Sequence, residues 1–120
     1  MVRALFYCKD GIIFTASRGG KDYNCSTQHL RNDPMLQALF KAYPDMILDG
    51  ELYKHGWSLQ KISGLCRLQT PTDECEQLEY WIYDYISEEP FEQRYETLNT
   101  MSELFAENSK IKIVEHVKTA

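Results

Sequence analysis

An Asp-Gly-Glu triplet, Asp49, Gly50 and Glu51, is the part of this sequence best suited to chemistry. It continues the apolar run of residues 46–48, so the sequence predicts a strand that presents carboxylates at a turn or an open surface. Glycine permits close backbone approach, and a carboxylate accepts hydrogen bonds from a ligand hydroxyl or holds a metal-bound water. A strand that ends in a turn with an exposed acid is also commonplace, so the triplet alone supports either interpretation.

An aromatic segment, residues 78–86, is the second region that could contact a ligand, because aromatic faces stack on nucleobases. Its composition also favours a strand whose rings pack in a core. Strand alternation predicts Trp81, Tyr83 and Tyr85 on one face, and Tyr80, Ile82 and Asp84 on the other.

Composition restricts the classes of protein to consider. The 120 residues suit one domain or a piece of a larger one, and 43% hydrophobic with 26% charged residues is globular composition. A formal charge of −5 disfavours non-specific coating of nucleic acid, which needs clustered lysine and arginine. No apolar run approaches the ~20 residues that span a bilayer, and the N-terminus does not resemble a signal peptide. We therefore expect a cytoplasmic protein with no membrane partner.

Cysteine and histidine spacing gives no sign of a metal centre. The four cysteines, Cys8, Cys25, Cys66 and Cys75, form no Cys-x-x-Cys pair, and the three histidines lie far apart in the chain. Without a secretion signal, free thiols are expected rather than disulfides.

The expected elements alternate between strands and helices. The sequence predicts strands over 2–8 and 12–16, a loop over 17–33, a helix from Pro34 to before Pro44, a strand over 46–52, a helix over 58–66, a loop over 70–76, a strand over 78–86, a helix from 90 or 91 to 107, and a strand over 111–117. This order predicts an α+β domain with a mixed, largely antiparallel sheet and packed helices.

Four features now follow one another: Ser17-Arg18-Gly19-Gly20 after a strand pair, the triplet at 49–51, the Tyr83-Asp84 pair in its aromatic strand, and the segment 91–98. In this order they resemble the adenylation (nucleotidyltransferase) domain of ATP-dependent DNA ligases, most like the small viral, phage and bacterial enzymes. The resemblance covers essentially all 120 residues. It implies an ATP-grasp-like nucleotidyltransferase fold.

The sequence departs from the family pattern at both ends. In the family a Lys-x-Asp-Gly-x-Arg motif opens the domain, and Arg3 resembles its arginine, so the nucleophilic lysine would lie before Met1. Lys9 directly precedes Asp10 in a hairpin turn and matches that lysine poorly. The family's Glu-Gly and Lys-x-Lys motifs would follow residue 120. The resemblance thus predicts a single partial adenylation domain, residues 1–120, that is inactive in isolation.

The family reaction attaches AMP from ATP to the lysine, passes it to the 5′-phosphate of nicked duplex DNA and then seals the nick. Each step is an in-line transfer at phosphorus, aided by Mg2+ and cationic side chains. The resemblance therefore implies ATP and Mg2+ as cofactors and nicked DNA as partner, as in DNA replication, repair and recombination. It also implies N- and C-terminal segments, or separate chains, that complete the domain.

The resemblance assigns roles residue by residue. Arg3, Arg18, Glu51 and Tyr83 are the expected nucleotide-binding residues, Glu51 is also the candidate metal ligand, and Asp49 and Asp84 are expected to support them. For each residue an ordinary structural role remains the alternative: an exposed arginine, a core tyrosine or a turn-stabilising acid. Arg94 and the glutamates around it are expected to form a solvated helix face.

Other functions fit the same motifs. An RNA ligase or an mRNA-capping nucleotidyltransferase shares the motif order, and no residue excludes RNA as the substrate. A non-catalytic remnant that binds a nucleotide or a protein partner is a further alternative, favoured by the missing lysine.

Overall fold

The computed structural model describes residues 2–70, 72–103, 105 and 109–114. Its elements are β1 (Val2–Lys9), β2 (Ile12–Ala16), α1 (Gln28–Arg31), α2 (Pro34–Ala42), β3 (Ile47–Tyr53), α3 (Leu59–Cys66), the 3-10 helix η1 (Cys75–Gln77), β4 (Glu79–Tyr85), α4 (Phe91–Ser102) and β5 (Ile111–Ile113). The strands form one sheet in the order β2-β1-β3-β4-β5. All neighbours are antiparallel except β4 and β5, which confirms the predicted α+β class with a mixed, largely antiparallel sheet.

The local signals at turns and helix ends are confirmed. Asp10 (φ 54°) and Gly11 (φ 80°) form the tight turn between β1 and β2, where an Asp-Gly pair tolerates positive φ. The Asp33 carboxylate accepts hydrogen bonds from the backbone N–H groups of Met35 and Leu36 and so caps α2. Ser58, expected as the first residue of the next helix, instead precedes it, and its hydroxyl accepts a hydrogen bond from the backbone N–H of Lys61 to cap α3.

The predicted loop over 17–33 is wrong in part, because it contains the short helix α1. Its last residue, Arg31, donates from Nε to the backbone oxygen of Asn24 (3.1 Å) and from Nη1 to that of Ile13 (3.4 Å). The Asn24 side chain in turn accepts from the backbone N–H of Thr15 (2.7 Å). Arg31 therefore fastens this segment to β2, rather than extending from it as a phosphate-binding side chain.

Other boundaries also differ from expectation. The predicted loop over 70–76 contains the start of η1, and α4 ends at Ser102 instead of 107. β5 ends at Ile113, so Val114 lies outside the strand that was predicted over 111–117. Residues 115–117 of that prediction lie outside the described residues. The four cysteines are free thiols, as predicted. In the described part of the chain no helix has the length and apolar composition needed to cross a membrane.

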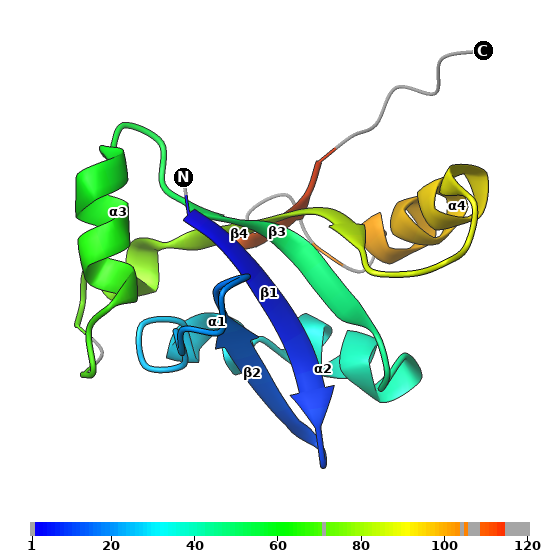
Figure 1. Ribbon diagram of the computed structural model, residues 1–120, viewed down its shortest axis with the longest axis horizontal. Helices are drawn as coiled ribbons and strands as arrows, with labels where there is room; N and C mark the ends of the chain where they lie inside the picture. The colour runs from blue at the N-terminus through cyan, green and yellow to red at the C-terminus, as the bar shows by residue number, and fades with distance from the viewer. Residues whose placement is uncertain (1, 71, 104, 106–108, 115–120) are drawn as a thin grey trace.

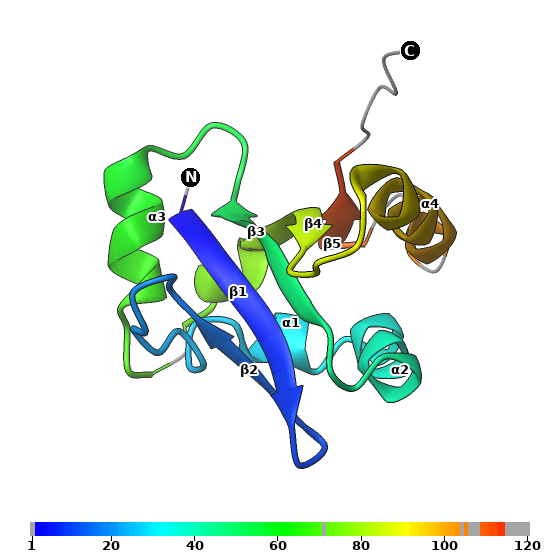
Figure 2. The same cartoon turned by 45° about the vertical axis from the view of Figure 1, so that its right-hand side comes forward.

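The two faces of the sheet differ. One face carries the buried core, where residues such as Phe6, Leu48 and Leu52 alternate with outward-facing neighbours. Figures 1 and 2 show α1 and α2 behind this face, with α3 and α4 at opposite ends of the sheet. In Figure 1 no described helix crosses the front of β1 and β3. We call this front the open face, because the alternate residues of β1, β3 and β4 lie there without a covering layer.

A β-bulge in β4 decides which aromatic residues reach the open face. Asp49 pairs with Asp84 but the next residue, Gly50, pairs with Ile82, so Tyr83 is the extra residue. The bulge reverses the alternation beyond it. Tyr85 (7% exposed) therefore joins the core with Ile82, and Asp84 lies on the open face. The predicted sharing of one face by Trp81, Tyr83 and Tyr85 is wrong for Tyr85, and the predicted placement of Asp84 is wrong too.

Gly50 has a structural role that its position in the triplet does not reveal. A Cβ at this position would lie 2.2 Å from the backbone oxygen of Trp81 and 3.0 Å from Cζ of Tyr80. The fully buried Tyr80 ring passes beneath β3 here, and its hydroxyl donates to the backbone oxygens of Ala4 (2.9 Å) and Leu48 (3.2 Å). Glycine is thus needed for the strand to pass over a buried tyrosine that links β1, β3 and β4.

Replacing Gly50 with alanine is expected to destabilise the fold by about 1–3 kcal/mol, because the added methyl group must displace backbone or a buried ring. Gly64 is the matched control, since a Cβ there meets no atom within 4 Å. Gly64 lies at an exposed position of α3, where replacement of glycine by alanine is expected to stabilise the protein by up to about 1 kcal/mol. Urea denaturation of both variants measures the difference, and equal stabilities would contradict the close approach at Gly50.

Candidate functional site

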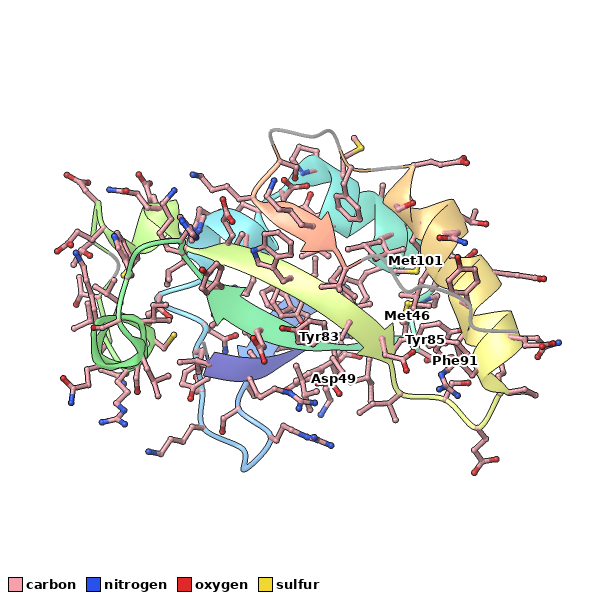
Figure 3. The ribbon with its side chains drawn as sticks, turned by 90° about the horizontal axis from the view of Figure 1, so that it is seen from above. Met46, Asp49, Tyr83, Tyr85, Phe91 and Met101 are labelled. Atoms are coloured by element: carbon pink, nitrogen blue, oxygen red, sulfur yellow. The ribbon has the colours of Figure 1, made fainter. Side chains whose placement is uncertain are left out.

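The triplet and the aromatic strand meet on the open face. The sheet register places Arg3 opposite Glu51, and Glu51 opposite Trp81. A hollow of about 260 Å3 opens here, lined by Glu51, Tyr53, Trp81 and Tyr83. We refer to these four residues as the open-face hollow. Figure 3 shows Tyr83 and Asp49 close together on the sheet.

Glu51 is the feature of the hollow that most needs a ligand. Its Oε2 atom is buried and makes no hydrogen bond within the described part of the chain. A buried acceptor without a donor costs free energy, and more so when it carries charge, so native proteins give most such atoms a donor from the chain, from a ligand or from ordered water. The open-face hollow thus offers a carboxylate oxygen to a donor that the described chain does not supply.

Arg3 is held in place by Asp49. Its Nη2 atom donates to both carboxylate oxygens of Asp49, at 3.1 Å and 2.9 Å. The Arg3 side chain is 47% exposed, whereas that of Asp49 is 17% exposed. Since Nη2 alone makes these bonds, Nε and Nη1 can donate to a second group. Asp49 therefore orients a partly exposed cation beside Glu51, which is a supporting role.

Asp84 is committed to α4 rather than to the hollow. Its carboxylate accepts hydrogen bonds from Arg94 Nε (3.1 Å to each oxygen) and from the backbone N–H of Tyr85 (2.8 Å). Arg94 also donates from Nη1 to the backbone oxygen of Glu89 (2.7 Å). The prediction that Arg94 belongs to a solvated helix face is therefore wrong. Asp84 supports the fold at the edge of the site by fixing the start of α4.

Sequence reasoning missed Tyr53 and Lys112, and it left open whether Trp81 or a neighbouring aromatic residue contacts a base. Tyr53 and Trp81 line the hollow with their rings edge to face (centroids 6.4 Å apart), and Lys112 Nζ lies 5.9 Å from the Trp81 ring centroid. A signal for two of them existed in the sequence: Tyr53 is two residues after Glu51, and Trp81 two before Tyr83. Strand alternation places each pair on one face. Lys112 gave no such signal, because its place depends on the parallel pairing of β5 with β4.

Of the predicted site residues, Glu51 and Tyr83 line the hollow, and Arg18 is one that the structure does not bring to it. It is exposed in the turn after β2, a turn held by hydrogen bonds from Gly20 N to the Ser17 backbone oxygen (2.9 Å) and from Lys21 N to Ser17 Oγ (2.8 Å). It does not line the hollow. Its role in nucleotide binding stays a prediction.

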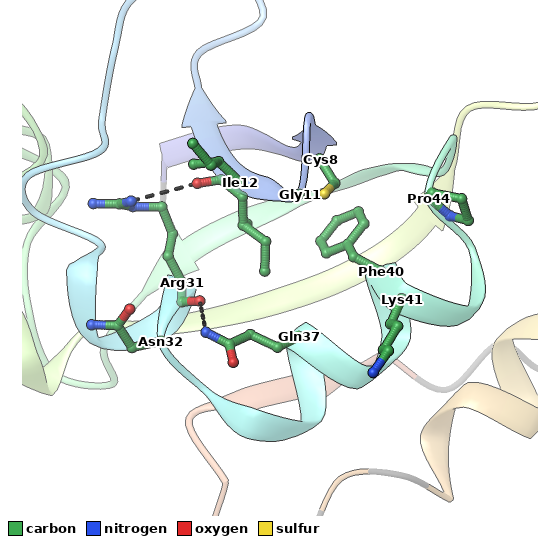
Figure 4. Close-up of a pocket in the computed structure, with 10 residues that line it drawn as sticks. Cys8, Gly11, Ile12, Arg31, Asn32, Gln37, Phe40, Lys41 and Pro44 are labelled. Atoms are coloured by element: carbon green, nitrogen blue, oxygen red, sulfur yellow. Dashed lines mark hydrogen bonds between the residues drawn. The ribbon is translucent and has the colours of Figure 1, made fainter.

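A second hollow of about 530 Å3 lies between the β1–β2 hairpin and α2, on the helix-covered side of the sheet. Figure 4 shows Ile12 and Phe40 on its walls and the stem of Arg31 along one side. Arg31 is bonded to backbone oxygens, and Gln37 Nε2 donates to the backbone oxygen of Arg31 (3.4 Å). None of the predicted site residues lines this second hollow.

Among the described residues, no group of three or more histidine, cysteine, aspartate or glutamate side chains is placed to hold a metal ion. Asp49 is already paired with Arg3, and Asp84 with Arg94. Glu51 thus remains the carboxylate of the site that could contribute to a metal shared with a ligand.

The comparisons with known proteins establish the fold. No protein-family model matches the sequence, and no curated protein matches it. Among solved structures the chain is similar to one described as Pmar-Lig_Pre, with a TM-score of 0.62 and 18% sequence identity over 95% of this chain. The chain spans 28% of the length of that protein. At this identity the likeness shows a shared fold, and the function must be argued from the site.

The Glu51–Tyr83 pair has a measurable electrostatic signature. Burial raises the pKa of Tyr83 to about 12, with further contributions from a hydrogen bond to Glu51 and from the negative charge of Glu51, while Arg3 opposes them. Because the carboxylate disfavours the tyrosinate, Glu51→Gln is expected to lower the pKa of Tyr83 toward its ordinary value of about 10. NMR titration of a protein with 13Cζ-labelled tyrosine, with Tyr83 assigned through Tyr83→Phe, measures the shift. Glu79→Gln, on the same strand, is the control and is expected to leave the pKa unchanged.

Proposed function

We propose that this chain is the nucleotide-binding part of an ATP-dependent DNA ligase adenylation domain, with ATP bound on the open face. The observation that carries the proposal is the buried, unpaired Oε2 of Glu51 inside a hollow walled by aromatic rings. A nucleoside supplies what this hollow needs: hydroxyl donors for the carboxylate and a flat base for the rings. The similarity to Pmar-Lig_Pre, in whose name we read Lig as ligase, supports this choice.

The aromatic residues of the hollow would hold the base. The bulge places Tyr83 and Trp81 on the open face and Tyr80 and Tyr85 in the core. Of the four aromatic rings of β4, two can therefore contact a purine on the open face. We assign Tyr83 as the stacking platform, because its hydroxyl is anchored by Glu51 and its ring is held beside the hollow. An anchored ring loses little conformational entropy when the base binds.

Glu51 and Arg3 would hold the ribose and the phosphates. The free oxygen of Glu51 accepts a hydrogen bond from a ribose hydroxyl, and the unbonded Nε and Nη1 of Arg3 donate to a phosphate oxygen. Cross-strand pairing keeps the two side chains adjacent, and Asp49 keeps the guanidinium in position. We propose Arg18 as a further contact to the same phosphates, on the strength of the family resemblance alone.

Mg2+ fits this arrangement as an ion held chiefly by the nucleotide. Magnesium typically takes one or two carboxylates together with substrate phosphates, and Glu51 is the carboxylate not engaged by an arginine. When bound, the ion would offset negative charge on the phosphates during transfer. The transfer itself needs a lysine nucleophile, which the family resemblance does not place among residues 1–120. We therefore propose nicked duplex DNA as the partner of the complete domain.

A related nucleotidyltransferase is the second candidate. An RNA ligase and a capping enzyme share the motif order, so the open-face hollow would serve either of them as a nucleotide site. Base preference distinguishes a capping enzyme from a DNA or RNA ligase, because a capping enzyme uses GTP and the ligases use ATP.

ATP binding is expected to quench the fluorescence of Trp81. The chain has two tryptophans, so a Trp57→Phe background leaves Trp81 as the reporter. In this background Glu51→Gln is expected to weaken ATP binding by about tenfold, or 1.4 kcal/mol, because the neutral amide oxygen is a weaker acceptor for the ribose hydroxyl than the charged carboxylate. Glu92→Gln, on the exposed first turn of α4, is the control and should bind as tightly as the background protein. No saturable quenching by ATP would reject the proposed function, and a stronger response to GTP would favour the capping alternative.

Covalent chemistry gives an independent check. Incubation with radiolabelled ATP and Mg2+ is expected to leave no acid-stable AMP adduct on this chain, because Lys9 stands at the far end of β1 from Arg3 and matches the family lysine poorly. Gel autoradiography after acid precipitation measures the adduct. An adduct that Lys9→Ala abolishes would show that the nucleophile has been misassigned.

A further inference from the structure

We propose that a groove at the end of the sheet, between α2 and the end of β4, docks a basic segment of a protein partner that carries large apolar side chains. The groove has a volume of about 380 Å3, and Tyr43, Asp45, Met46, Tyr85, Ile86 and Glu89 are among the residues that line it. We call it the α2–β4 groove. It shares no lining residue with the open-face hollow, so this inference does not depend on the proposed function.

The walls of the α2–β4 groove expose large apolar side chains to water. Ile86 is 54% exposed and Tyr43 42% exposed. Phe91, which does not line the groove, is 43% exposed at the start of α4. Figure 3 shows Met46 and Tyr85 together near Phe91, where β4 ends beside α4. Gathered apolar side chains of this kind mark interaction sites, and a methionine in the floor adapts to the shape of an inserted side chain.

The charge around the groove decides which class of partner it fits. Asp45 and Glu89 line it, Glu88 and Glu92 lie next to it in the chain, and all four are exposed. None forms an ion pair with a described residue, and the lining residues include no lysine, arginine or histidine. Arg94 does not offset this charge, because it is engaged by Asp84 and by the backbone oxygen of Glu89. Lys41, which precedes the lining residue Ala42, is the exposed cation nearest in the chain, and it lines the second hollow instead.

A negative rim around an apolar floor complements lysine and arginine side chains that flank a leucine or an aromatic residue. The same rim repels the phosphates of nucleic acid and of anionic lipid. It also disfavours a second copy of this chain, whose formal charge is −5. A basic segment of another protein is therefore the occupant that the groove fits.

Binding can be tested with a fluorescein-labelled amphipathic peptide of lysine and leucine, followed by fluorescence anisotropy on the full chain. We expect saturable binding that Ile86→Ser weakens by about tenfold, as truncation at the centre of a contact does. Ile12→Ser is the matched control, because Ile12 is equally exposed (56%) but lies in the β1–β2 hairpin. A peptide with glutamate in place of lysine is expected not to bind.

The requirement for negative charge beside the groove is tested with two double variants that change the net charge equally. Glu88→Lys with Glu89→Lys is expected to weaken binding of the lysine peptide by at least about tenfold, whereas Asp73→Lys with Glu76→Lys makes the same change of net charge elsewhere and should have a small effect. Circular dichroism confirms that each variant is folded, and if Ile86→Ser is not, the charge pair still decides. Absence of saturable binding, or equal losses in the target and control variants, would overturn the proposal, because non-specific charge attraction would then explain any signal.

Discussion

The close approach of β3 to the buried Tyr80 ring is the constraint on which the rest of the structure depends. Only glycine leaves room for the ring beneath the strand, and the Tyr80 hydroxyl then reaches backbone oxygens of β1 and β3 from its own strand, β4. Burial raises the pKa of Tyr80 well above its ordinary range, so the hydroxyl remains a donor at all physiological pH values. The Tyr80 hydroxyl thereby joins three strands directly under the open face. Asp49 and Glu51, on either side of Gly50, extend from this hydrogen-bonded part of the sheet.

Asp49 and Glu51 therefore differ in role although both flank Gly50 and both lie on the open face. Asp49 stands opposite Asp84 in the sheet, a repulsive arrangement for two carboxylates, and each is compensated by its own arginine, Arg3 or Arg94. Glu51 stands between Arg3 and Trp81 and keeps one oxygen unpaired. The paired acids stabilise the sheet and the start of α4, whereas the unpaired acid is left available for a ligand.

Most of the fold could be predicted because its signals are local. The Asp10-Gly11 turn and the helix that Asp33 caps each depend on the chemistry of a few neighbouring residues. What could not be predicted depends on contacts between distant segments: the hydrogen bonds of Arg31 that order α1, the ion pair of Arg94 with Asp84, and the position of Lys112 over Trp81. Sequence spacing carries no information about such contacts.

The bulge at Tyr83 shows how one extra residue can separate a binding surface from a core within a single strand. Without it, strict alternation would place Tyr85 beside Tyr83 on the open face and remove its ring from the core. With it, the strand gives Trp81 and Tyr83 to the hollow and Tyr80, Ile82 and Tyr85 to the core. The bulge begins directly opposite the Asp49–Gly50 step, so the glycine that admits the Tyr80 ring also adjoins the change of register. The chemistry of the triplet and the shape of the aromatic strand are thus consequences of the same local geometry.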